Sequence, residues 1–592
     1  MATRLKPVDA VIVGVGLTGT ILAKELAEAG LKVVGLERGR WRDTDPDFGM
    51  PYAHDELRFV KRHELMQDLS RETITFRNNA NETALPMRQL GSFRPGEGVG
   101  GAAVHWGAVT WRFLPWDFET RSRTLARYGK DQIAADCTSQ DWGVTYDELE
   151  PHYDAFEYLC GTSGTAGNLR GQIQEGGNPF EGPRSRPYPN PAQAQPFSYT
   201  LFAQAARELG YKPFPQPSGN MSKAYTNPLG IRLGPCTYCG FCEWFGCGNY
   251  SKASPQTTIL PVLIRKSNFA VRDNSEVTRI NTDRSGKRAT GVTFVDTSGE
   301  EWEQPADLVI LSAFTVFNVQ LLLLSKIGQP YDPVANSGVI GRNFTHQTIS
   351  DALGFFDNKK FNFNPFIASG SIGMCIDEFN GDNFDHGPHG FVGGGYMGQV
   401  QTNGRPIQTT PVPPGTPKWG AAWKTAVRDN YLSTVKPGTG VHGSFYSYRD
   451  IYLDLDPTYR DRFGRPLMRM TVDFHDNEIK QNAFLTDRFA EIIKAMGARE
   501  VSKEYRKAPY DITDYQTTHV CGGAIMGADP TTSAINRYLQ SWDVPNLFVM
   551  GASAFPQNPG YNPTGTVCAL AYWSAAAIRN QYLKNPGPLV DA

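Results

Sequence analysis

The sequence lacks the features of a membrane-spanning or nucleic-acid-binding protein. No apolar run reaches the roughly 18 residues that cross a bilayer as a helix, and no basic patch with interleaved aromatic residues is present. The 592 residues carry a net charge of only −2. A separate apolar leader is also missing, because MATRLKPVDAVIVG passes straight into a predicted buried strand. We therefore expect a soluble chain, whose export would need a partner that carries the signal.

Internal repeats and low-complexity tracts are absent as well. Hydrophobic residues make up 40% of the chain, which is enough for a large core. Chains of this size commonly divide into more than one lobe. We expect two lobes of one interleaved architecture.

The cysteine count is odd, which argues against a framework of disulfides. Five of the nine are scattered, at Cys137, Cys160, Cys375, Cys521 and Cys568. The other four fall in CTYCGFCEWFGC, at Cys236, Cys239, Cys242 and Cys247. A structural zinc site usually takes two well-separated cysteine pairs, whereas thiolates this close together are typical of iron–sulfur ligands. The segment predicts an iron–sulfur cluster, with zinc, or free or paired thiols, as alternatives, and leaves open how many of the four are ligands.

The N-terminal segment has the pattern of a dinucleotide-binding unit. A short β-branched run, VDAVIVGV, is followed by Gly14, Gly16 and Gly19, then a helix pattern and a second strand that ends at Glu37. Glycines at this spacing allow a tight turn and bring a pyrophosphate close to a helix N-terminus, while an acid at the second strand binds ribose hydroxyls. This unit alone leaves NAD and FAD open.

A second glycine-rich segment, GEGVGGAAVHWG, favours FAD. It contains Gly96, Gly98, Gly100 and Gly101, a density that would only weaken a packed element unless the backbone approaches a ligand. The alternative is a flexible surface loop. The apolar neighbours Val99, Val104 and Trp106 favour the buried interpretation.

Taken together, these segments resemble the glucose-methanol-choline (GMC) oxidoreductases. The resemblance is also carried by VILSAFTVFNVQLLLLSKIG at 309–328, GVIGRNF at 338–344, THVCGGAIMG and NLFVMGASAFPQNPGYNPTGT. Within the family, DLSRETITFRNNA, CTYCGFC and the closing NPTGT resemble the flavoprotein subunits of bacterial membrane-bound gluconate 2-dehydrogenases. The implied fold class is α/β (α+β overall), with a Rossmann-type FAD-binding domain and an interleaved substrate-binding domain built on an antiparallel sheet.

The expected domain organisation follows from this resemblance. FAD-binding segments are expected at 1–115, 226–345 and 510–592, of which the second also holds the cysteine segment and the third the catalytic pair. Residues 116–225 are predicted to form a cap over the cofactor. Residues 346–509 are predicted to form the substrate-binding domain, because their aromatic and glycine-rich stretches favour strands.

The resemblance implies that an alcohol is oxidised by hydride transfer to a flavin while a base takes the hydroxyl proton. His519 matches the family's catalytic histidine, and Asn562 matches its C-terminal partner. A histidine of ordinary pKa, roughly 6.5, accepts a proton near neutrality. From the residues alone, His519 also suits a structural role, and Asn562, before Pro563, a turn.

The same resemblance implies the FAD contacts. They are Gly14, Gly16, Gly19, Glu37, Gly98, Gly100, Gly101, His105, Trp106, Val277, Gly551, Ala552, Thr564 and Thr566. The helix that follows Asn562 is expected to direct its N-terminal dipole at the cofactor. His105 precedes Trp106 as in sugar oxidases whose histidine bonds covalently to the flavin, so we predict His105 as an attachment point, the alternative being contact without a bond.

The implied substrate is a sugar acid or polyol, first of all D-gluconate oxidised to 2-dehydro-D-gluconate. The alternatives are a 2-ketogluconate, sorbitol or glycoside 3-dehydrogenase, or an oxygen-using sugar oxidase of the same fold. No motif marks a residue for the substrate carboxylate, and His386, His389, His442 and His475 are more typical of structural histidines.

Related glucose and fructose dehydrogenases carry a [3Fe-4S] cluster on three cysteines. That comparison makes Cys242 and Cys247 ligands and leaves Cys236 and Cys239 as alternatives for the third. It also implies two partners, a small subunit with a twin-arginine signal and a multihaem cytochrome c subunit. The implied location is periplasmic, on the outer face of the inner membrane, with membrane contact only through those partners.

Overall fold

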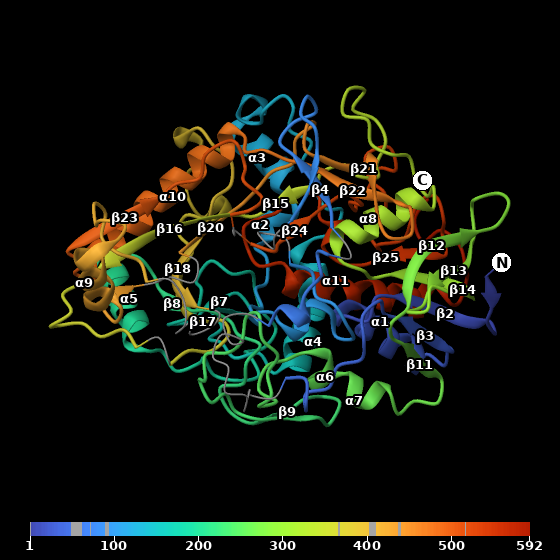
Figure 1. Cartoon of the computed structure of the whole chain (residues 1–592), viewed down its shortest axis with the longest axis horizontal. Coiled ribbons are helices and arrows are strands. Elements are labelled where there is room, and N and C mark those ends of the chain that lie inside the picture. Colours follow the sequence, from blue (N-terminus) through green and yellow to red (C-terminus); the bar gives the residue numbers. More distant parts are fainter. Residues whose placement is uncertain are drawn as a thin grey trace.

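The structure is a computed structural model of the chain. It describes residues 2–48, 62–70, 73–88, 94–364, 367–401, 410–435, 440–514 and 517–591. Two large sheets organise these residues, one at each end of the view in Figure 1.

The first sheet is largely parallel and confirms the Rossmann-type prediction. Its strand order is β11-β3-β2-β14-β13-β12, with β1 and β25 also pairing with β14. The strands are β1 Thr3–Arg4, β2 Val8–Val13, β3 Val33–Leu36, β11 Phe269–Arg272, β12 Glu276–Thr282, β13 Ala289–Val295, β14 Glu301–Leu311 and β25 Leu547–Val549. β12 and β13 run antiparallel, whereas β11, β3, β2, β14 and β25 are parallel. The β2 residues from Ala10 onward are buried, as expected for a central strand with both faces covered.

Backbone packing shapes the turn between β2 and helix α1, Leu17–Glu28. Gly14 has a φ of +93°, and a Cβ there would lie 2.6 Å from the Ser312 carbonyl oxygen. A Cβ on Gly19 would lie 2.1 Å from the Gly14 carbonyl oxygen. Side chains at these positions would push the helix away from the strand, so the glycines hold the helix N-terminus against the sheet edge.

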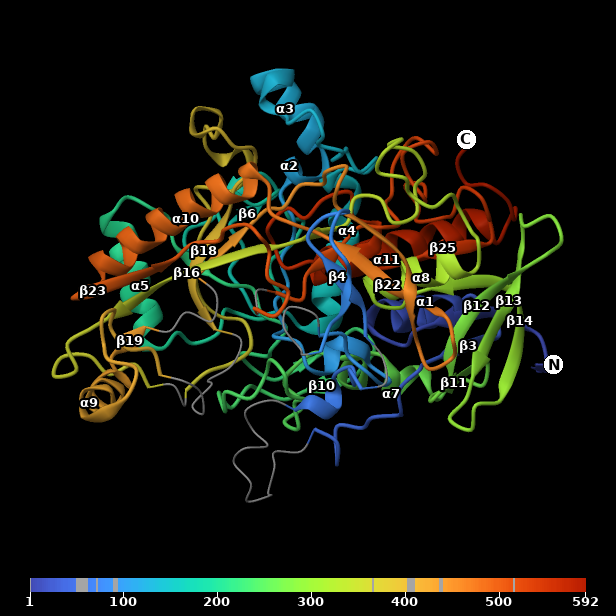
Figure 2. The same cartoon turned by 45° about the horizontal axis from the view of Figure 1, so that its top comes forward.

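The second large sheet is antiparallel, which confirms the other half of the predicted fold. It has the order β19-β16-β20-β18-β17-β8, with β23 paired to β16. The strands are β8 Phe214–Pro215, β16 Thr348–Phe355, β17 Ile372–Ile376, β18 Gly395–Gln401, β19 Thr434–Val435, β20 Val441–Gly443 and β23 Glu500–Glu504. Helices α5, Phe197–Glu208, and α10, Asp476–Ala495, pack side by side against it and enclose a second core (Figure 2).

Helix α11, Thr564–Ala577, crosses the centre of the molecule (Figure 1). It packs between α1 and α4, Tyr146–Cys160, and is apolar on most of its surface. Glu157 on α4 forms a buried ionic network with Arg112 and Arg184. The hydroxyl groups of Tyr153 and Thr566 lie 2.6 Å apart and connect α4 to the first turn of α11.

Smaller elements complete the fold. A four-stranded sheet contains β4 Thr75–Arg77, β5 Leu85–Pro86, β21 Tyr452–Arg460 and β22 Pro466–Thr471. Two-stranded pairs are β6 Asn168–Leu169 with β7 Gln172–Ile173, β9 Tyr225–Thr226 with β10 Arg232–Leu233, and β15 Thr345–His346 with β24 Val520–Cys521. The remaining α-helices are α2 Pro115–Phe118, α3 Thr120–Tyr128, α6 Pro255–Thr258, α7 Leu260–Leu263, α8 Thr315–Leu324 and α9 Gly420–Asn430. Among the described residues, no helix has the length and apolarity needed to span a membrane.

Candidate active site

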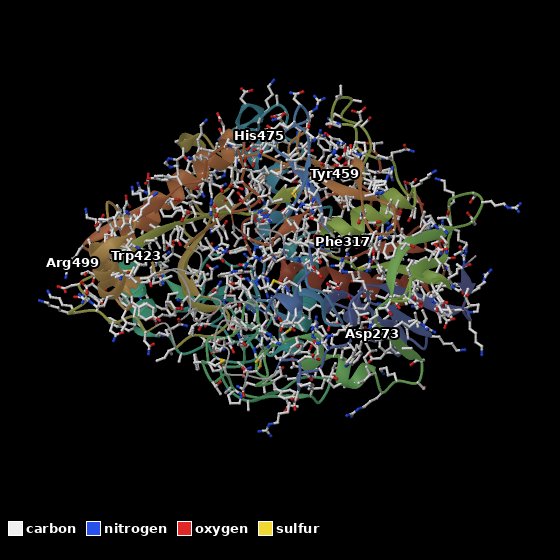
Figure 3. The ribbon with its side chains drawn as sticks, in the orientation of Figure 1. Asp273, Phe317, Trp423, Tyr459, His475 and Arg499 are labelled. Atoms are coloured by element: carbon white, nitrogen blue, oxygen red, sulfur yellow. The ribbon has the colours of Figure 1, made fainter. Side chains whose placement is uncertain are left out.

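A cavity of about 360 Å³ begins at the carboxyl ends of the parallel strands and reaches the antiparallel sheet. The strand ends contribute Val13, Leu36, Ser312 and Gly551, and the far side contributes Ile349 and His442. Phe317 on α8 also lines the cavity, and Figure 3 shows it near the middle of the molecule, far from Arg499 and Trp423. A cavity at this edge of a parallel sheet is the usual place for a nucleotide ligand.

The nucleotide end of the cavity is organised by Glu37. Its two carboxylate oxygens accept hydrogen bonds from the backbone N–H groups of Val15, at 3.0 Å, and Gly39, at 3.1 Å. Burial raises the pKa of Glu37, and these backbone donors oppose that rise. The carboxylate is thereby fixed at the cavity wall with acceptor capacity left over, which suits a pair of ribose hydroxyls.

The two glycine-rich segments meet at this end. A Cβ on Gly101 would lie 3.1 Å from the Cα atom of Gly16, and the Gly100 N–H donates to the Val15 carbonyl at 2.8 Å. The cavity lining includes Gly14, Gly16, Glu37, Gly101, His105, Trp106, Val277, Gly551, Ala552 and Thr564. Four other predicted contacts, Gly19, Gly98, Gly100 and Thr566, lie outside this lining. The bare backbone at Gly14, Gly16 and Gly101 fits a close-lying pyrophosphate, so the cavity fits a flavin dinucleotide.

His105 lines the same cavity and is buried, and its Nε2 atom has no hydrogen-bond partner. Burial, together with the nearby charge of Lys252, lowers the pKa of His105 to about 3. The neighbouring Trp106 is fixed because its indole N–H donates to the Ala253 carbonyl at 2.8 Å. An unprotonated, unpartnered imidazole nitrogen suits contact with a cofactor, because burying such an atom without a partner costs free energy.

His519 is oriented by a residue that the sequence analysis did not find. Its Nδ1 atom lies 2.5 Å from the Gln347 side-chain oxygen. The amide nitrogen of Gln347 donates to the Gly560 carbonyl, so the amide oxygen has to face the histidine. An amide oxygen can only accept, so Nδ1 carries the proton and Nε2 is left as the proton acceptor.

Asn562 faces the free nitrogen of that ring. Its amide nitrogen lies 3.4 Å from His519 Nε2, while its amide oxygen accepts from the Tyr396 hydroxyl at 2.9 Å. The tyrosine therefore fixes which end of the amide points at the histidine. The Tyr396 ring in turn stacks on His442 with centroids 4.6 Å apart. The structure thus brings the predicted pair together, and adds Tyr396 and His442 to it.

Three of the four histidines noted in the predicted substrate-binding region lie outside the cavity lining. His442 lines the cavity, but His386, His389 and His475 do not. His475 lies at the top of the view in Figure 3 and pairs with Asp450 at 3.0 Å. Of the four, only His442 is placed to touch a substrate.

The half-buried position of His519 at the cavity wall changes its expected chemistry. Burial, and to a smaller extent repulsion from His346, lowers the pKa of His519 to about 3, far below the ordinary value used in the sequence analysis. A lowered pKa means that the ring stays unprotonated until the pH falls to that value. The His519 imidazole is therefore already neutral in mildly acidic solution.

We expect the rate constant of flavin reduction by substrate to stay constant from about pH 7 to about pH 5, because His519 needs no deprotonation there. Stopped-flow measurement of flavin bleaching in single turnover tests this. A fall that follows one titration near pH 6.5 would show that His519 has an ordinary pKa.

The cysteine segment lies directly behind the cavity wall. Glu243 and Trp244 line the cavity, whereas the adjacent Cys242 is buried. All nine cysteines are free thiols, and within the described residues no three of the four segment thiols lie within 4.8 Å of one another. Burial raises the pKa of the Cys242 thiol, and the charges of Cys236, Cys239 and Cys247 raise it further, so the four thiols lie close enough to interact electrostatically. They form one group of soft sulfur ligands beside the cavity wall.

Comparison with known proteins agrees with this geometry. Models of the GMC oxidoreductase family match residues 188–349 and 450–571. The chain is 52% identical to the gluconate 2-dehydrogenase flavoprotein of Pantoea cypripedii, covering 100% of this chain and 97% of that protein. It is 25% identical to the fructose dehydrogenase large subunit of Gluconobacter japonicus, covering 98% and 99% of the two chains. The solved structure of pyridoxine 4-oxidase from Mesorbium loti superposes with a TM-score of 0.58 at 18% identity over 98% of this chain and 100% of that one.

Proposed function

This chain belongs to the GMC oxidoreductase family of FAD-dependent alcohol oxidoreductases, and from that premise we propose that it oxidises D-gluconate to 2-dehydro-D-gluconate. The observation that carries the proposal is the His519–Asn562 pair, which meets in a cavity whose other end has the Gly14–Glu37 nucleotide unit. The choice of gluconate is supported by the full-length similarity to a gluconate 2-dehydrogenase flavoprotein.

FAD supplies the hydride acceptor when it is bound. Glu37 would hold the ribose, and the backbone at Gly14, Gly16 and Gly101 would approach the pyrophosphate. The N-terminus of α11 begins at Thr564 in the cavity lining, where its dipole stabilises negative charge.

The protein's own groups would handle the substrate proton. His519 Nε2 accepts the proton of the hydroxyl that is oxidised, and Gln347 keeps the ring in the required tautomer. The Asn562 amide nitrogen donates to the same substrate oxygen without competing for the proton. His442 is the polar group next to this pair and offers a contact to another hydroxyl.

We also propose that electrons leave through an iron–sulfur cluster, a [3Fe-4S] cluster by resemblance, held by the cysteines at 236–247. The proposed partners are a small subunit with a twin-arginine signal and a multihaem cytochrome c, with the complex on the outer face of the inner membrane. The four neighbouring thiols support this proposal, as does the similarity to a protein named as a large subunit. Low-temperature electron paramagnetic resonance of the native complex would detect the cluster, and cell fractionation would test the location.

The substrate is tested by mixing the oxidised protein anaerobically with gluconate, 2-ketogluconate, glucose, sorbitol and glucosides. Flavin bleaching should be fastest with gluconate, and the product should carry its new carbonyl at C2. If another compound of the panel bleaches the flavin faster, that compound and not gluconate is the preferred substrate. Oxygen consumption without reduction of an artificial dye would instead identify an oxidase.

We expect the flavin to stay with the polypeptide after denaturation in acid, because His105 lines the cavity and its Nε2 atom has no hydrogen-bond partner within the protein. In a His105→Ala variant, the yellow chromophore should pass into the supernatant. If the chromophore of the unaltered protein is also found wholly in the supernatant, His105 is a contact and not an attachment point.

A further inference from the structure

Lys252 is a buried lysine held at the junction of the cavity wall and the cysteine segment. It is 1% exposed. Its ammonium group donates to the carbonyls of Trp106 at 3.0 Å, Cys242 at 2.8 Å and Phe245 at 2.7 Å. All three of its hydrogens are therefore used, two on the cysteine segment and one on the segment that carries His105.

The charge of this ammonium group has no carboxylate in contact with it. Within the described part of the chain, Lys252 forms no ion pair. Carbonyl dipoles solvate a cation but do not neutralise it, and an uncompensated buried charge is strongly unfavourable. The Glu243 carboxylate interacts with Lys252 electrostatically but forms no ion pair with it, so the ammonium group still has no anion in direct contact.

The cysteine segment can supply that charge. The backbone carbonyl of Cys242 accepts a hydrogen bond from the ammonium group, and Cys242 itself is buried. Thiols that bind iron do so as thiolates, and a cluster with its thiolates carries net negative charge. The ammonium group of Lys252, which lacks an anion, therefore lies beside the cysteine thiolates, which with their cluster need a cation.

We propose that Lys252 is the fixed counter-charge of the cysteine-bound cluster and raises its reduction potential. This inference rests on the cluster in the proposed function. Reduction adds one negative charge to the cluster, so a nearby buried cation stabilises the reduced form more than the oxidised form. Because the same group also bonds to Trp106, it ties the electron-accepting site to the flavin side of the wall.

Three variants separate charge from hydrogen bonding. Lys252→Arg keeps the charge, Lys252→Gln keeps two donors without charge, and Lys252→Met fills similar volume with neither. Each is purified as the complete complex and assayed for iron, for FAD and for the cluster midpoint potential by redox titration of its paramagnetic signal.

We expect the Gln and Met variants to lower the equilibrium constant for cluster reduction at least tenfold, which is about 59 mV for one electron. The Arg variant should stay within a factor of two. Loss of iron from the Gln and Met variants alone, with FAD and circular dichroism unchanged, would also support the counter-charge. The proposal is overturned if the neutral variants keep their iron and potential, or if the Arg variant fails to fold or bind iron as the neutral ones do.

A cluster signal missing from the unaltered complex would be a different result. It would remove the cluster from the proposed function before Lys252 is tested. The signal of the unaltered complex thus distinguishes failure of the proposed function from failure of the Lys252 inference.

Discussion

We expect flavin reduction by substrate to slow roughly 100-fold or more when His519 is replaced by alanine, the usual scale for loss of a general base. The contacts of His519 give the reason for expecting an effect of this size. Gln347 and Asn562 contact the two ring nitrogens of His519 and hold the ring in place, so the substitution removes an oriented proton acceptor from this end of the cavity. Stopped-flow bleaching at saturating substrate measures the rate constant directly.

His389→Ala is the matched control, because this histidine is exposed and lies outside the cavity. It should leave the rate constant unchanged. FAD content has to be equal in the two variants for the comparison to hold. A His519→Ala protein that is reduced at the unaltered rate would show that His519 is not the base.

The Glu157→Ala variant is expected to lose about 3–5 kcal/mol of folding free energy, the usual cost of breaking a buried ion pair. Glu157 accepts from Arg112 at 2.8 and 2.9 Å and also pairs with Arg184. The three side chains are 0–2% exposed. Although burial opposes it, the two guanidinium groups hold the pKa of Glu157 below its ordinary value. Without this carboxylate, the two buried cations keep only their outer partners, Glu150 at 2.9 Å from Arg112 and Glu181 at 3.5 Å from Arg184.

Urea unfolding followed by circular dichroism measures this loss, and Glu157→Gln should lose less because the amide still accepts hydrogen bonds. Glu300→Ala removes an exposed carboxylate and should unfold at the same urea concentration as the unaltered protein. If Glu157→Ala also matches the unaltered midpoint, the network contributes nothing to stability. A large loss matters for a protein whose total stability is only about 5–15 kcal/mol.

The nucleotide-binding part of the fold was predictable because its pattern is local. A buried strand, spaced glycines, a helix and Glu37 follow one another along the chain, and the structure keeps them in that arrangement. The prediction that Glu37 binds ribose hydroxyls rested only on the strand pattern that precedes it. His519 and Asn562, in contrast, were identified through the family resemblance, since nothing in their immediate sequence marks them.

The rest of the site could not be predicted, for a physical reason. Gln347, Tyr396 and His442 lie at the start of β16, on β18 and on β20, and they meet His519 and Asn562 only after the antiparallel sheet forms. Contacts between such distant segments leave no spacing pattern in a single sequence. The pKa of His519 was missed for the same reason, because burial is a property of the folded chain.

The segment from Cys242 to Trp244 contributes both to the cavity lining and to the proposed cluster site. It therefore links the choice of substrate to the transfer of electrons. Glu243 and Trp244 line the cavity, while their neighbour Cys242 belongs to the proposed electron exit. A substitution at either residue alters the packing directly beside the backbone that carries this thiol. Under the proposed function, we therefore expect substitutions at this wall that change which sugars are accepted to change the rate of electron transfer from the flavin as well.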